Sequence, residues 1–224
     1  MIIAVDGPAG SGKSSVCASV SEKLGWVYIN TGFLYRALGV VARQRGTDIR
    51  DSGGLQLIID EFNEALVWDA EGGNLLFGDR NLTPYLHTEQ AGADASYVAK
   101  DAGVRERLLP LQRKLPLQSP TGAIVDGRDI GTVVFPDADL KIFMTASLEE
   151  RARRRVRQLN ELAGDESAAD FETVKNDIAA RDEQDAGRAA APLKQADDAV
   201  VFDTSALPFD QAVESLIRLI KDKV

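Results

Sequence analysis

A glycine-rich segment near the start of the chain has the composition of a phosphate-binding loop. Residues 7–14 read Gly-Pro-Ala-Gly-Ser-Gly-Lys-Ser and fit the pattern G-x-x-x-x-G-K-S/T. Glycines allow the backbone to curl closely enough for several amide N–H groups to point at one phosphate chain. In such a loop Lys13 can reach the β- and γ-phosphates of a nucleoside triphosphate, and the Ser14 hydroxyl can hold Mg²⁺. The predicted nucleotide-binding residues are Gly7, Pro8, Ala9, Gly10, Ser11, Gly12, Lys13, Ser14 and Ser15.

The residues on either side of this loop place it between a strand and a helix. Residues 2–5 form a continuous apolar run, as expected of a strand that is buried on both faces of a parallel sheet. After the loop, Val16, Val20 and Leu24 recur at a spacing of four and mark one face of a helix. A helix that starts here adds partial positive charge to the phosphate site. We therefore expect this loop to bind a nucleoside triphosphate such as ATP.

Other motifs bear on how the bound nucleotide is used. A GTPase switch needs the base-reading motif Asn-Lys-x-Asp, which this sequence lacks. Motor ATPases usually carry two adjacent acidic residues after a later strand, whereas here the apolar pair Ile124-Val125 precedes Asp126-Gly-Arg-Asp129. Ligands bind at strand ends in open α/β sheets. A single acid followed by glycine and Arg128 therefore favours a second phosphate-bearing ligand over a water positioned for hydrolysis.

Arginines elsewhere in the chain are candidates for binding this second ligand. Phosphoryl transfer is catalysed mostly by positioning and by the positive charge of Lys, Arg and Mg²⁺. An acceptor phosphate is already largely ionised at pH 7, because its second pKa is about 6. No general base is then needed, which suits a chain with one histidine, His87. The separated candidates are Arg36, Arg105, Arg128, Arg181 and Arg188.

A run of arginines in the second half of the chain has an open assignment. Its members are Arg151, Arg153, Arg154, Arg155 and Arg157. On a helix, Arg151 and Arg155 share one face, and so do Arg154 and Arg157. We expect at least one of them to contact the phosphates of ATP, but the spacing alone does not choose which. Binding of nucleic acid by this run is disfavoured because residues 165–172 are acidic.

The composition excludes several classes of protein. The 224 residues are 44% hydrophobic and 27% charged, unlike disordered or collagen-like chains. The formal net charge of −9 argues against binding of nucleic acid or of an anionic membrane, which both need clustered positive charge. The single cysteine, Cys17, permits no internal disulfide and, with one histidine, no zinc site. We expect Cys17 to be a small buried residue.

The N-terminal sequence predicts neither a signal peptide nor a membrane span. Asp6 interrupts the first apolar run before it reaches the length of a signal sequence. The longest apolar stretches, such as residues 37–42, fall far short of the ~18 residues that a spanning helix needs. We therefore expect a soluble cytoplasmic protein.

Apolar runs and helical patterns alternate along most of the chain. Besides residues 2–5, the expected strands are 26–29, 123–125, 140–144 and 199–202. Besides the helix after the loop, the expected helices are 31–45 with Thr31 as its cap, 55–66, 148–162, 171–185 and 209–223. This alternation predicts an α/β fold with a doubly wound parallel sheet.

One stretch interrupts the alternation. Residues 66–69 and 74–77 read as two strands around Glu71-Gly72-Gly73, which predicts an antiparallel hairpin with a glycine turn. A hairpin does not fit a parallel core, so we expect an inserted lobe at 62–98 that carries a small antiparallel sheet. The core then comprises 1–61 and 99–224, with a helical lid at roughly 151–190. A hairpin that merely decorates the surface is the alternative.

Four spaced motifs resemble those of the bacterial-type cytidylate kinases, in the nucleoside monophosphate kinase family. They are residues 6–14, the segment Thr31-Gly-Phe-Leu-Tyr-Arg36, residues 126–136 (Asp-Gly-Arg-Asp-Ile-Gly-Thr-Val-Val-Phe-Pro), and residues 181–193. The resemblance covers nearly the whole chain, and the third motif is the most specific. It implies a P-loop core with a parallel sheet, a helical lid over ATP, and a monophosphate-binding lobe enlarged by an antiparallel sheet.

The resemblance also implies roles for individual residues. Lys13, Arg128 and Arg188 are the expected catalytic residues, and Arg36, Arg128 and Arg188 would grip the phosphate of CMP. The other expected substrate-binding residues are Thr31, Ser96, Arg105, Asp129, Arg181 and Asp185. Of these, Ser96, Arg105 and Asp129 would face the cytosine, whose amino donor and ring acceptors suit a carboxylate and a guanidinium. Arg181 and Asp185 would contact the sugar.

The resemblance thus implies an ATP-dependent kinase that converts CMP or dCMP to the diphosphate with Mg²⁺, and we expect a monomer. A related kinase with another acceptor, such as UMP or shikimate, is the nearest alternative. A P-loop binding or switch protein that hydrolyses its nucleotide slowly is the alternative from another class. The sequence does not choose between CMP and dCMP.

Overall fold

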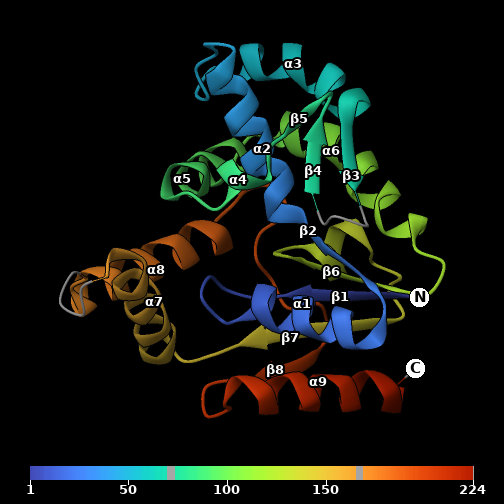
Figure 1. The fold of residues 1–224 in the computed structure, drawn as a ribbon, viewed down its shortest axis with the longest axis vertical. Helices are drawn as coiled ribbons and strands as arrows, with labels where there is room; N and C mark the ends of the chain where they lie inside the picture. Colours follow the sequence, from blue (N-terminus) through green and yellow to red (C-terminus); the bar gives the residue numbers. More distant parts are fainter. Residues whose placement is uncertain (70–73, 165–168, 224) are drawn as a thin grey trace. The chain divides into compact units, whose positions relative to one another are not determined.

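The computed structural model describes residues 1–69, 74–164 and 169–223 (Figure 1). They form two compact units. The first unit comprises Met1–Tyr28 and Thr121–Val224, and the second comprises Ile29–Pro120. The turn of the predicted hairpin, residues 70–73, lies outside the described residues.

The first unit is built on a five-stranded sheet with the strand order β2-β6-β1-β7-β8. The strands are β1 (Ile2–Asp6), β2 (Val27–Asn30), β6 (Ala123–Gly127), β7 (Leu140–Thr145) and β8 (Val200–Asp203). β1 pairs in parallel with β6 and β7, and β7 pairs in parallel with β8. Because β1 is flanked on both edges and covered on both faces, its residues Ile3, Ala4 and Val5 are fully buried. All five predicted strands are confirmed, with ends that differ by at most two residues.

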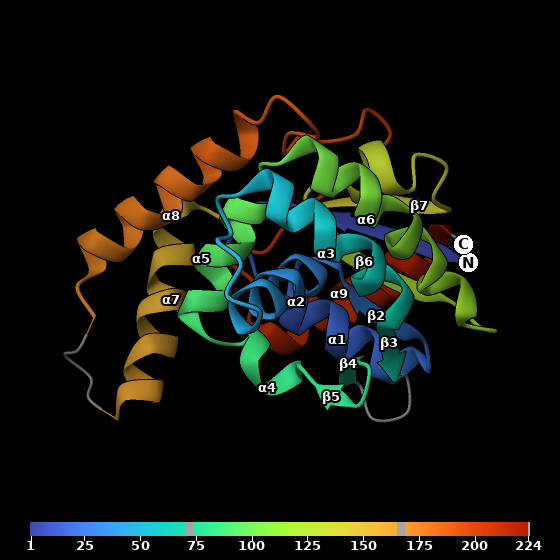
Figure 2. The ribbon, with the colours of Figure 1, turned by 90° about the horizontal axis from the view of Figure 1, so that it is seen from above.

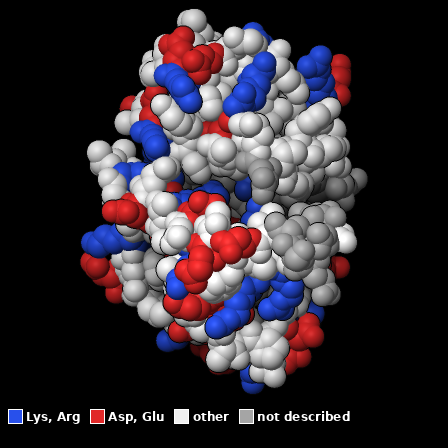
Figure 3. All heavy atoms as spheres, turned by 90° about the vertical axis from the view of Figure 1, so that its left-hand side faces the viewer, with Lys and Arg blue, Asp and Glu red and all other residues white. Residues whose placement is uncertain are grey.

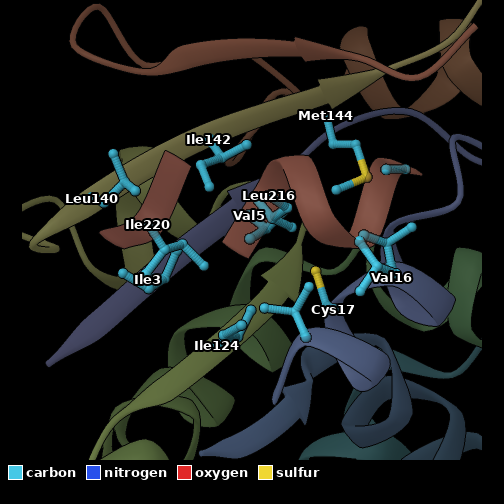
Figure 4. Packing of buried hydrophobic residues seen from close by; sticks show 13 residues of the cluster. Ile3, Val5, Val16, Cys17, Ile124, Leu140, Ile142, Met144, Leu216 and Ile220 are labelled. Atoms are coloured by element: carbon cyan, nitrogen blue, oxygen red, sulfur yellow. The ribbon is translucent and has the colours of Figure 1, made fainter. Parts of the chain in front are cut away.

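Two helices of the first unit pack on this sheet to form its core. They are α1 (Lys13–Leu24) and α9 (Phe209–Lys223). Figure 4 shows Val16 and Cys17 of α1 and Leu216 and Ile220 of α9 gathered over side chains of β1, β6 and β7. Cys17 is fully buried, which confirms its predicted place in the core.

Two further helices of the first unit occupy the segment predicted as a lid. They are α7 (Leu148–Ala163) and α8 (Phe171–Ala186), which lie side by side (Figures 1 and 2). Ala152 of α7 packs against Val174 and Ile178 of α8. Each helix starts at a capping side chain: Ser147 accepts a hydrogen bond from the Glu150 N–H, and Asp170 accepts one from the Thr173 N–H.

The second unit combines helices with a small antiparallel sheet. Its strands are β3 (Leu66–Asp69), β4 (Asn74–Phe77) and β5 (Arg80–Asn81), in this order. β3 and β4 pair antiparallel, as the sequence predicts for the hairpin. The helices are α2 (Thr31–Gln44), α3 (Ser52–Ala65), α4 (Thr83–Leu86), α5 (Glu89–Val98), α6 (Ala102–Lys114) and the 3₁₀ turn η1 (Pro116–Gln118). The predicted lobe at 62–98 lies within this unit, and its separate function stays a prediction.

The helix α5 gives no clear signal in the sequence because, apart from Val98 at its end, it buries only small or charged side chains. Ala91 and Ala95 are buried, and α5 packs against α2. The two helices approach so closely that a Cβ added to Gly39 of α2 would lie 2.9 Å from the Cβ of Asp94. Asp94 is itself buried and forms a salt bridge with Arg43 of α2. Close backbone contact and an ion pair thus replace the stripe of large apolar residues that sequence patterns detect.

The start of α2 differs from the prediction by one residue. Asn30 is the N-cap, without a hydrogen bond from its side chain, and Thr31 is the first helical residue. Thr31 is buried, with 4% of its surface exposed. β2 ends at Asn30 and α2 begins at Thr31 with no residue between them, so the last residue of the strand also caps the helix.

The surface charges, the helices and the two sheets can each be compared with what the sequence predicts. On the face seen in Figure 3, acidic and basic side chains are interspersed. Among the described residues, no helix combines the length and the apolar character that crossing a membrane requires. The parallel core sheet and the small antiparallel sheet are both as predicted.

The core packing of α9 leads to a test of stability. Leu216 is fully buried in the core beneath the sheet, so Leu216→Ala leaves a cavity and should lower the free energy of unfolding by about 2–5 kcal/mol. Leu57→Ala is the matched control, because Leu57 is also helical but is 83% exposed. Urea unfolding of both variants measures the effect. Equal losses in the two variants would contradict the packing described for α9.

Candidate active site

The loop between β1 and α1 curls around the side chain of Lys13. Its Nζ donates hydrogen bonds to the carbonyl oxygens of Gly7 and Pro8, both at 2.8 Å, and to Ser11 Oγ at 3.3 Å. Gly7 has a φ of 152°, and a Cβ at this position would lie 1.9 Å from the carbonyl oxygen of Met144. Only glycine fits where the loop leaves β1.

The end of the loop forms the start of α1. Gly12 is the N-cap, with a φ of 89° in the left-handed region that favours glycine. The first amide N–H groups of a helix have no partner within it, and they carry the positive end of the helix dipole. The N-terminus of α1 therefore favours binding of an anion such as a phosphate.

Side chains of α7 and the segment after β8 hold the outer side of the loop. Arg151 Nη1 donates to the carbonyl oxygen of Ala9 at 2.9 Å. The carbonyl oxygen of Ser11 accepts from Thr204 Oγ1 at 3.0 Å and from Arg154 Nη1 at 3.3 Å. Two arginines of the run thus contact the loop backbone directly.

The other members of the arginine run have different surroundings. Arg153 is 59% exposed and lies 3.5 Å from a carboxylate oxygen of Glu150. Arg155 donates to Gln158 at 2.8 Å. That at least one of the five contacts ATP stays a prediction.

Burial shapes the charge of the two ionisable groups at the ends of the loop. Burial and, to a lesser extent, the positive charge of Arg128 lower the pKa of Lys13 from its usual 10.5 to about 7. Burial also raises the pKa of Asp6 to about 6, although two backbone N–H groups partly offset this effect. Because the charge of Arg128 acts on Lys13, these two residues lie near each other although they are far apart in the sequence.

Asp126, at the end of β6, is joined to the loop by hydrogen bonds. Its Oδ2 accepts from the Ser14 hydroxyl at 2.7 Å and from the Tyr28 hydroxyl at 2.9 Å. Burial raises the pKa of Tyr28 well above its usual value, and the charge of Asp126 acts in the same direction. Neither Asp126 nor Tyr28 is among the residues predicted for the site. The position of Asp126 directly after a buried apolar strand is the signal that could have identified it.

Asp6 connects the end of β1 with the turn that follows β6. Its two carboxylate oxygens accept the backbone N–H groups of Ile130 and Gly131, both at 2.7 Å. These residues begin η2 (Ile130–Val134), a π-helical turn that the sequence does not predict. Asp6 therefore holds the segment that carries Arg128 and Asp129, of which Asp129 is 6% exposed. An acid that ends a fully apolar strand is the sequence signal for this role.

Asp185 brings together two of the predicted phosphate-binding arginines. It lies on α8, is 2% exposed, and accepts from Arg128 Nε at 2.9 Å. Its other oxygen forms a salt bridge with Arg188, which follows the end of α8. Arg181 lies one helical turn before Asp185. The structure thus gathers Arg128, Asp185 and Arg188 around one carboxylate.

A second group of predicted residues lies within the second unit. Arg36 of α2 donates to the carbonyl oxygen of Leu86, and its Nη2 lies 3.6 Å from the position of a Cβ on Gly92. Ser96 Oγ, one turn along α5, donates to the carbonyl oxygen of Gly92 at 3.1 Å. α2 and α5 therefore place both Arg36 and Ser96 beside Gly92.

Arg105 of α6 belongs to the same group. It is 9% exposed, donates to the carbonyl oxygen of Ala99 at 3.4 Å, and lies with its guanidinium over the ring of Tyr35 at 5.5 Å. Tyr35 precedes Arg36 on α2, so α2 connects these two arginines. The predicted substrate-binding residues thus form two sets. Arg128, Asp129, Arg181, Asp185 and Arg188 belong to the first unit, and Thr31, Arg36, Ser96 and Arg105 belong to the second.

Comparison with known proteins assigns this combination of loop and arginines to a family. The family profile described as cytidylate kinase matches residues 3–222. The chain belongs to the cytidylate kinase family. The proteins named cytidylate kinase from Shouchella clausii and from an Exiguobacterium species are similar over nearly their full length. The first is 42% identical over 221 residues, covering 98% of this chain and 96% of the relative. The second is 43% identical over 220 residues, covering 98% and 96%.

A further cytidylate kinase and a solved structure also match this chain. The cytidylate kinase from Azotobacter vinelandii is 41% identical over 219 residues, which cover 97% of this chain and 93% of the relative. Among solved structures, an uncharacterized protein from Eubacterium ventriosum superposes with a TM-score of 0.53 at 14% identity, over 99% of this chain and 98% of that one. At this identity the likeness concerns the fold alone.

The buried Lys13 predicts a pH dependence of stability that differs between the wild type and Lys13→Met. The pKa of Lys13 falls from its usual 10.5 to about 7 on folding. Between these values the unfolded chain keeps a proton that the folded chain releases, so this group makes the fold more stable as pH rises, by up to about 1.4 kcal/mol per pH unit. Lys13→Met lacks the proton. Its stability relative to the wild type should be highest at pH 7 and should decrease toward pH 10.

Thermal unfolding of the ligand-free proteins at a series of pH values measures this difference. Lys23→Met, which replaces an exposed lysine on the same helix, controls for the loss of one positive charge. If the wild type and Lys13→Met gave parallel curves from pH 7 to pH 10, the charge of Lys13 would not be buried in the folded loop.

Proposed function

We propose that this protein transfers the γ-phosphoryl group of ATP to CMP or dCMP, which yields ADP and CDP or dCDP. One observation carries the proposal: the first unit joins a P-loop to a pair of guanidinium groups, those of Arg128 and Arg188, held by one buried carboxylate. A P-loop alone would fit any user of nucleoside triphosphates. The added arginines fit a second ligand that is itself a phosphate, as in the family to which the chain belongs.

The donor nucleotide would bind along the P-loop. Backbone amides at the start of α1 would receive the β- and γ-phosphates, and Lys13 would exchange its bonds to the loop carbonyls for bonds to phosphate oxygens. Because the phosphates are negatively charged, binding raises the pKa of Lys13 and keeps its ammonium protonated. Lys13 then stabilises the charge that spreads over the moving phosphoryl group.

The acceptor phosphate would bind to arginines. As the family resemblance implies, Arg36, Arg128 and Arg188 would each bind it through charge-assisted hydrogen bonds. The acceptor oxygen is already ionised and attacks the γ-phosphorus directly, so no general base is required. The positive side chains orient the two phosphates and offset their mutual repulsion, which is the main barrier to bringing them together.

The base and the sugar of the acceptor would be recognised by separate groups. Asp129 would accept a hydrogen bond from the cytosine amino group, and Arg105 and Ser96 would complete the recognition of the base. Arg181 and Asp185 would contact the sugar. Since Asp185 also holds Arg128 and Arg188, contact of the sugar with this carboxylate would adjust both arginines at once.

Mg²⁺ would bind beside the donor phosphates. The Ser14 hydroxyl and the Asp126 carboxylate, joined by a hydrogen bond of 2.7 Å, are the hard oxygen donors that Mg²⁺ prefers. Mg²⁺ usually takes one or two carboxylates and completes its shell with phosphates and water, so this pair fits. When bound, the ion neutralises charge on the β- and γ-phosphates. The monomeric state and the cytoplasmic location stay predictions.

A panel of acceptors tests the function. The purified protein is incubated with ATP, Mg²⁺ and, in turn, CMP, dCMP, UMP or shikimate, and the products are separated by chromatography. We expect CDP and dCDP, and no transfer by Lys13→Met, which lacks the cation that faces the phosphates. Preferred transfer to UMP or shikimate would identify the related kinase. Release of phosphate from ATP at the same rate without any acceptor would indicate a slow switch protein, because a transferase excludes water until the acceptor is bound.

The arginines held by Asp185 give a prediction for the acceptor phosphate. Arg128→Ala and Arg188→Ala should each lower kcat/KM for CMP by about ten- to a hundredfold, since a hydrogen bond to a charged group contributes about 1.5–3 kcal/mol. Steady-state kinetics at saturating ATP measure this effect. Arg218→Ala, which changes an exposed arginine on α9, is the control. Unchanged kcat/KM in both variants would place the acceptor phosphate elsewhere.

Asp129 gives a prediction for the choice of base. A carboxylate accepts from the amino group of cytosine but meets an acceptor in uracil, and an unpaired buried polar group discriminates strongly. Asp129→Asn offers an amide donor, so the ratio of kcat/KM for CMP to that for UMP should decrease, mostly through loss of CMP activity. Kinetics with both substrates measure the ratio. If Asp129 served only to orient Arg128, both activities would fall in proportion and the ratio would equal that of the wild type.

A further inference from the structure

Asp182 of α8 contacts the P-loop, although it lies outside the predicted site. Its Oδ1 accepts the backbone N–H of Ala9 at 3.2 Å, and its Oδ2 forms a salt bridge with Arg151 Nη1. The same Nη1 donates to the carbonyl oxygen of Ala9 at 2.9 Å. One ion pair therefore binds both the N–H and the C=O group of a single loop residue.

Arg151 is anchored on its other side as well. Its Nε donates to the carbonyl oxygen of Ala146, just before α7, at 3.0 Å. The Arg151 side chain is 8% exposed and that of Asp182 is 21% exposed. With little water to compete, and with a planar guanidinium that matches three acceptors, this arrangement resists rotation of either side chain.

The contact with Ala9 affects the amides that follow it. In a trans peptide the C=O and the next N–H point in opposite directions. Since Arg151 holds the Ala9 carbonyl on the side of α7, the N–H of Gly10 points to the other side of the loop. Ser11 is held in the same way by Thr204 and Arg154, so the N–H of Gly12 also points away from α7. Loop amides turned in this way are the donors that a phosphate chain needs.

The same helix also carries the groups of the acceptor side. Asp185 lies three residues after Asp182 on α8, hence on a neighbouring part of the same face, and it holds Arg128 and Arg188. α8 is thus tied to the P-loop at Asp182 and to two arginines at Asp185. A shift of this helix changes both groups together.

We propose that Asp182 and Arg151 form a clamp that positions the P-loop for phosphoryl transfer and links it to the acceptor-side arginines through α8. The clamp residues are positioning residues, because they act on the loop backbone rather than on the reacting atoms. This inference rests on the proposed function for its kinetic readout. Its effect on the loop backbone is independent of the substrate.

The clamp predicts a larger effect on turnover than on binding. Transition-state stabilisation depends on donors that are already aligned, and small misplacements cost more in rate than in ground-state affinity. In Asp182→Ala, kcat for CMP should fall by about ten- to a hundredfold. The change in KM for ATP should be several times smaller than this change in kcat. Asp182→Asn keeps an oxygen for the Ala9 N–H but loses the charge that faces Arg151, so its kcat should lie between those of Asp182→Ala and the wild type.

Matched variants separate the clamp from a general effect on the fold. Asp177→Asn changes an exposed aspartate on the same helix and should leave kcat unchanged. Arg151→Lys keeps the positive charge but lacks the planar fork of the guanidinium, so its kcat should be as low as that of Arg151→Ala. If the two residues act as a unit, Asp182→Ala combined with Arg151→Ala should lose no more than the larger single loss. Melting temperatures, with kcat corrected for the folded fraction, exclude loss by unfolding.

Amide hydrogen exchange of the ligand-free protein gives a readout that needs no substrate. Peptides that cover residues 7–13 should exchange faster in Asp182→Ala than in the wild type and in Asp177→Asn. Unchanged exchange in the loop, or a kcat of Asp182→Ala within about twofold of the wild type, would overturn the clamp. If the wild type phosphorylates no nucleotide, the proposed function fails. The exchange data then decide on the clamp alone.

Discussion

The candidate site must hold several positive charges close together, and carboxylates that are fully or partly buried make this arrangement stable before any phosphate binds. Asp185 separates and orients Arg128 and Arg188, and Asp182 pairs with Arg151. Like charges repel strongly where burial excludes water, so these cations depend on their partners. Within the described residues, the hydrogen-bond partners of Lys13 include no carboxylate. Its ammonium group donates to the carbonyl oxygens of Gly7 and Pro8 instead, and its pKa falls to about 7. In the proposed function, bound phosphates would supply the missing negative charge, so ligand binding would be coupled to the protonation of Lys13.

The parallel sheet brings the parts of this site to one edge. β1 and β6 are neighbours, and Asp6 lies opposite Gly127 in their register. The P-loop follows β1 and Arg128 follows β6, so two segments more than a hundred residues apart leave the sheet at the same level. Asp6 then fixes the turn after β6 through the N–H groups of Ile130 and Gly131. Burial makes this carboxylate costly to ionise, and the two hydrogen bonds offset part of that cost.

The helices α7 and α8, predicted as a lid over the donor, also contact the P-loop itself. Arg151 and Arg154 of α7 donate hydrogen bonds to loop carbonyl oxygens, and Asp182 of α8 accepts one from a loop amide. The arginine run is therefore more than a charged helix face. Some of its members shape the backbone that meets the phosphate, and this explains why its spacing alone did not reveal a role. A helix pair that both shapes the loop and carries Asp185 is well placed to make transfer depend on the acceptor.

The sequence by itself determined the P-loop, the alternation of strands and helices, the hairpin at 66–77, and the family. These depend on local patterns: a glycine spacing, an apolar period, or a motif of consecutive residues. Only the tertiary structure decided the partners of the charged groups. The hydrogen bonds that define the site join residues far apart in the sequence. Tyr28 bonds to Asp126, 98 positions away. Asp6 bonds to Ile130 and Asp182 to Ala9 over still longer separations. No local pattern encodes such pairs, because the strand order and the packing of α7 and α8 bring them together, and the small side chains of α5 left its packing equally unmarked.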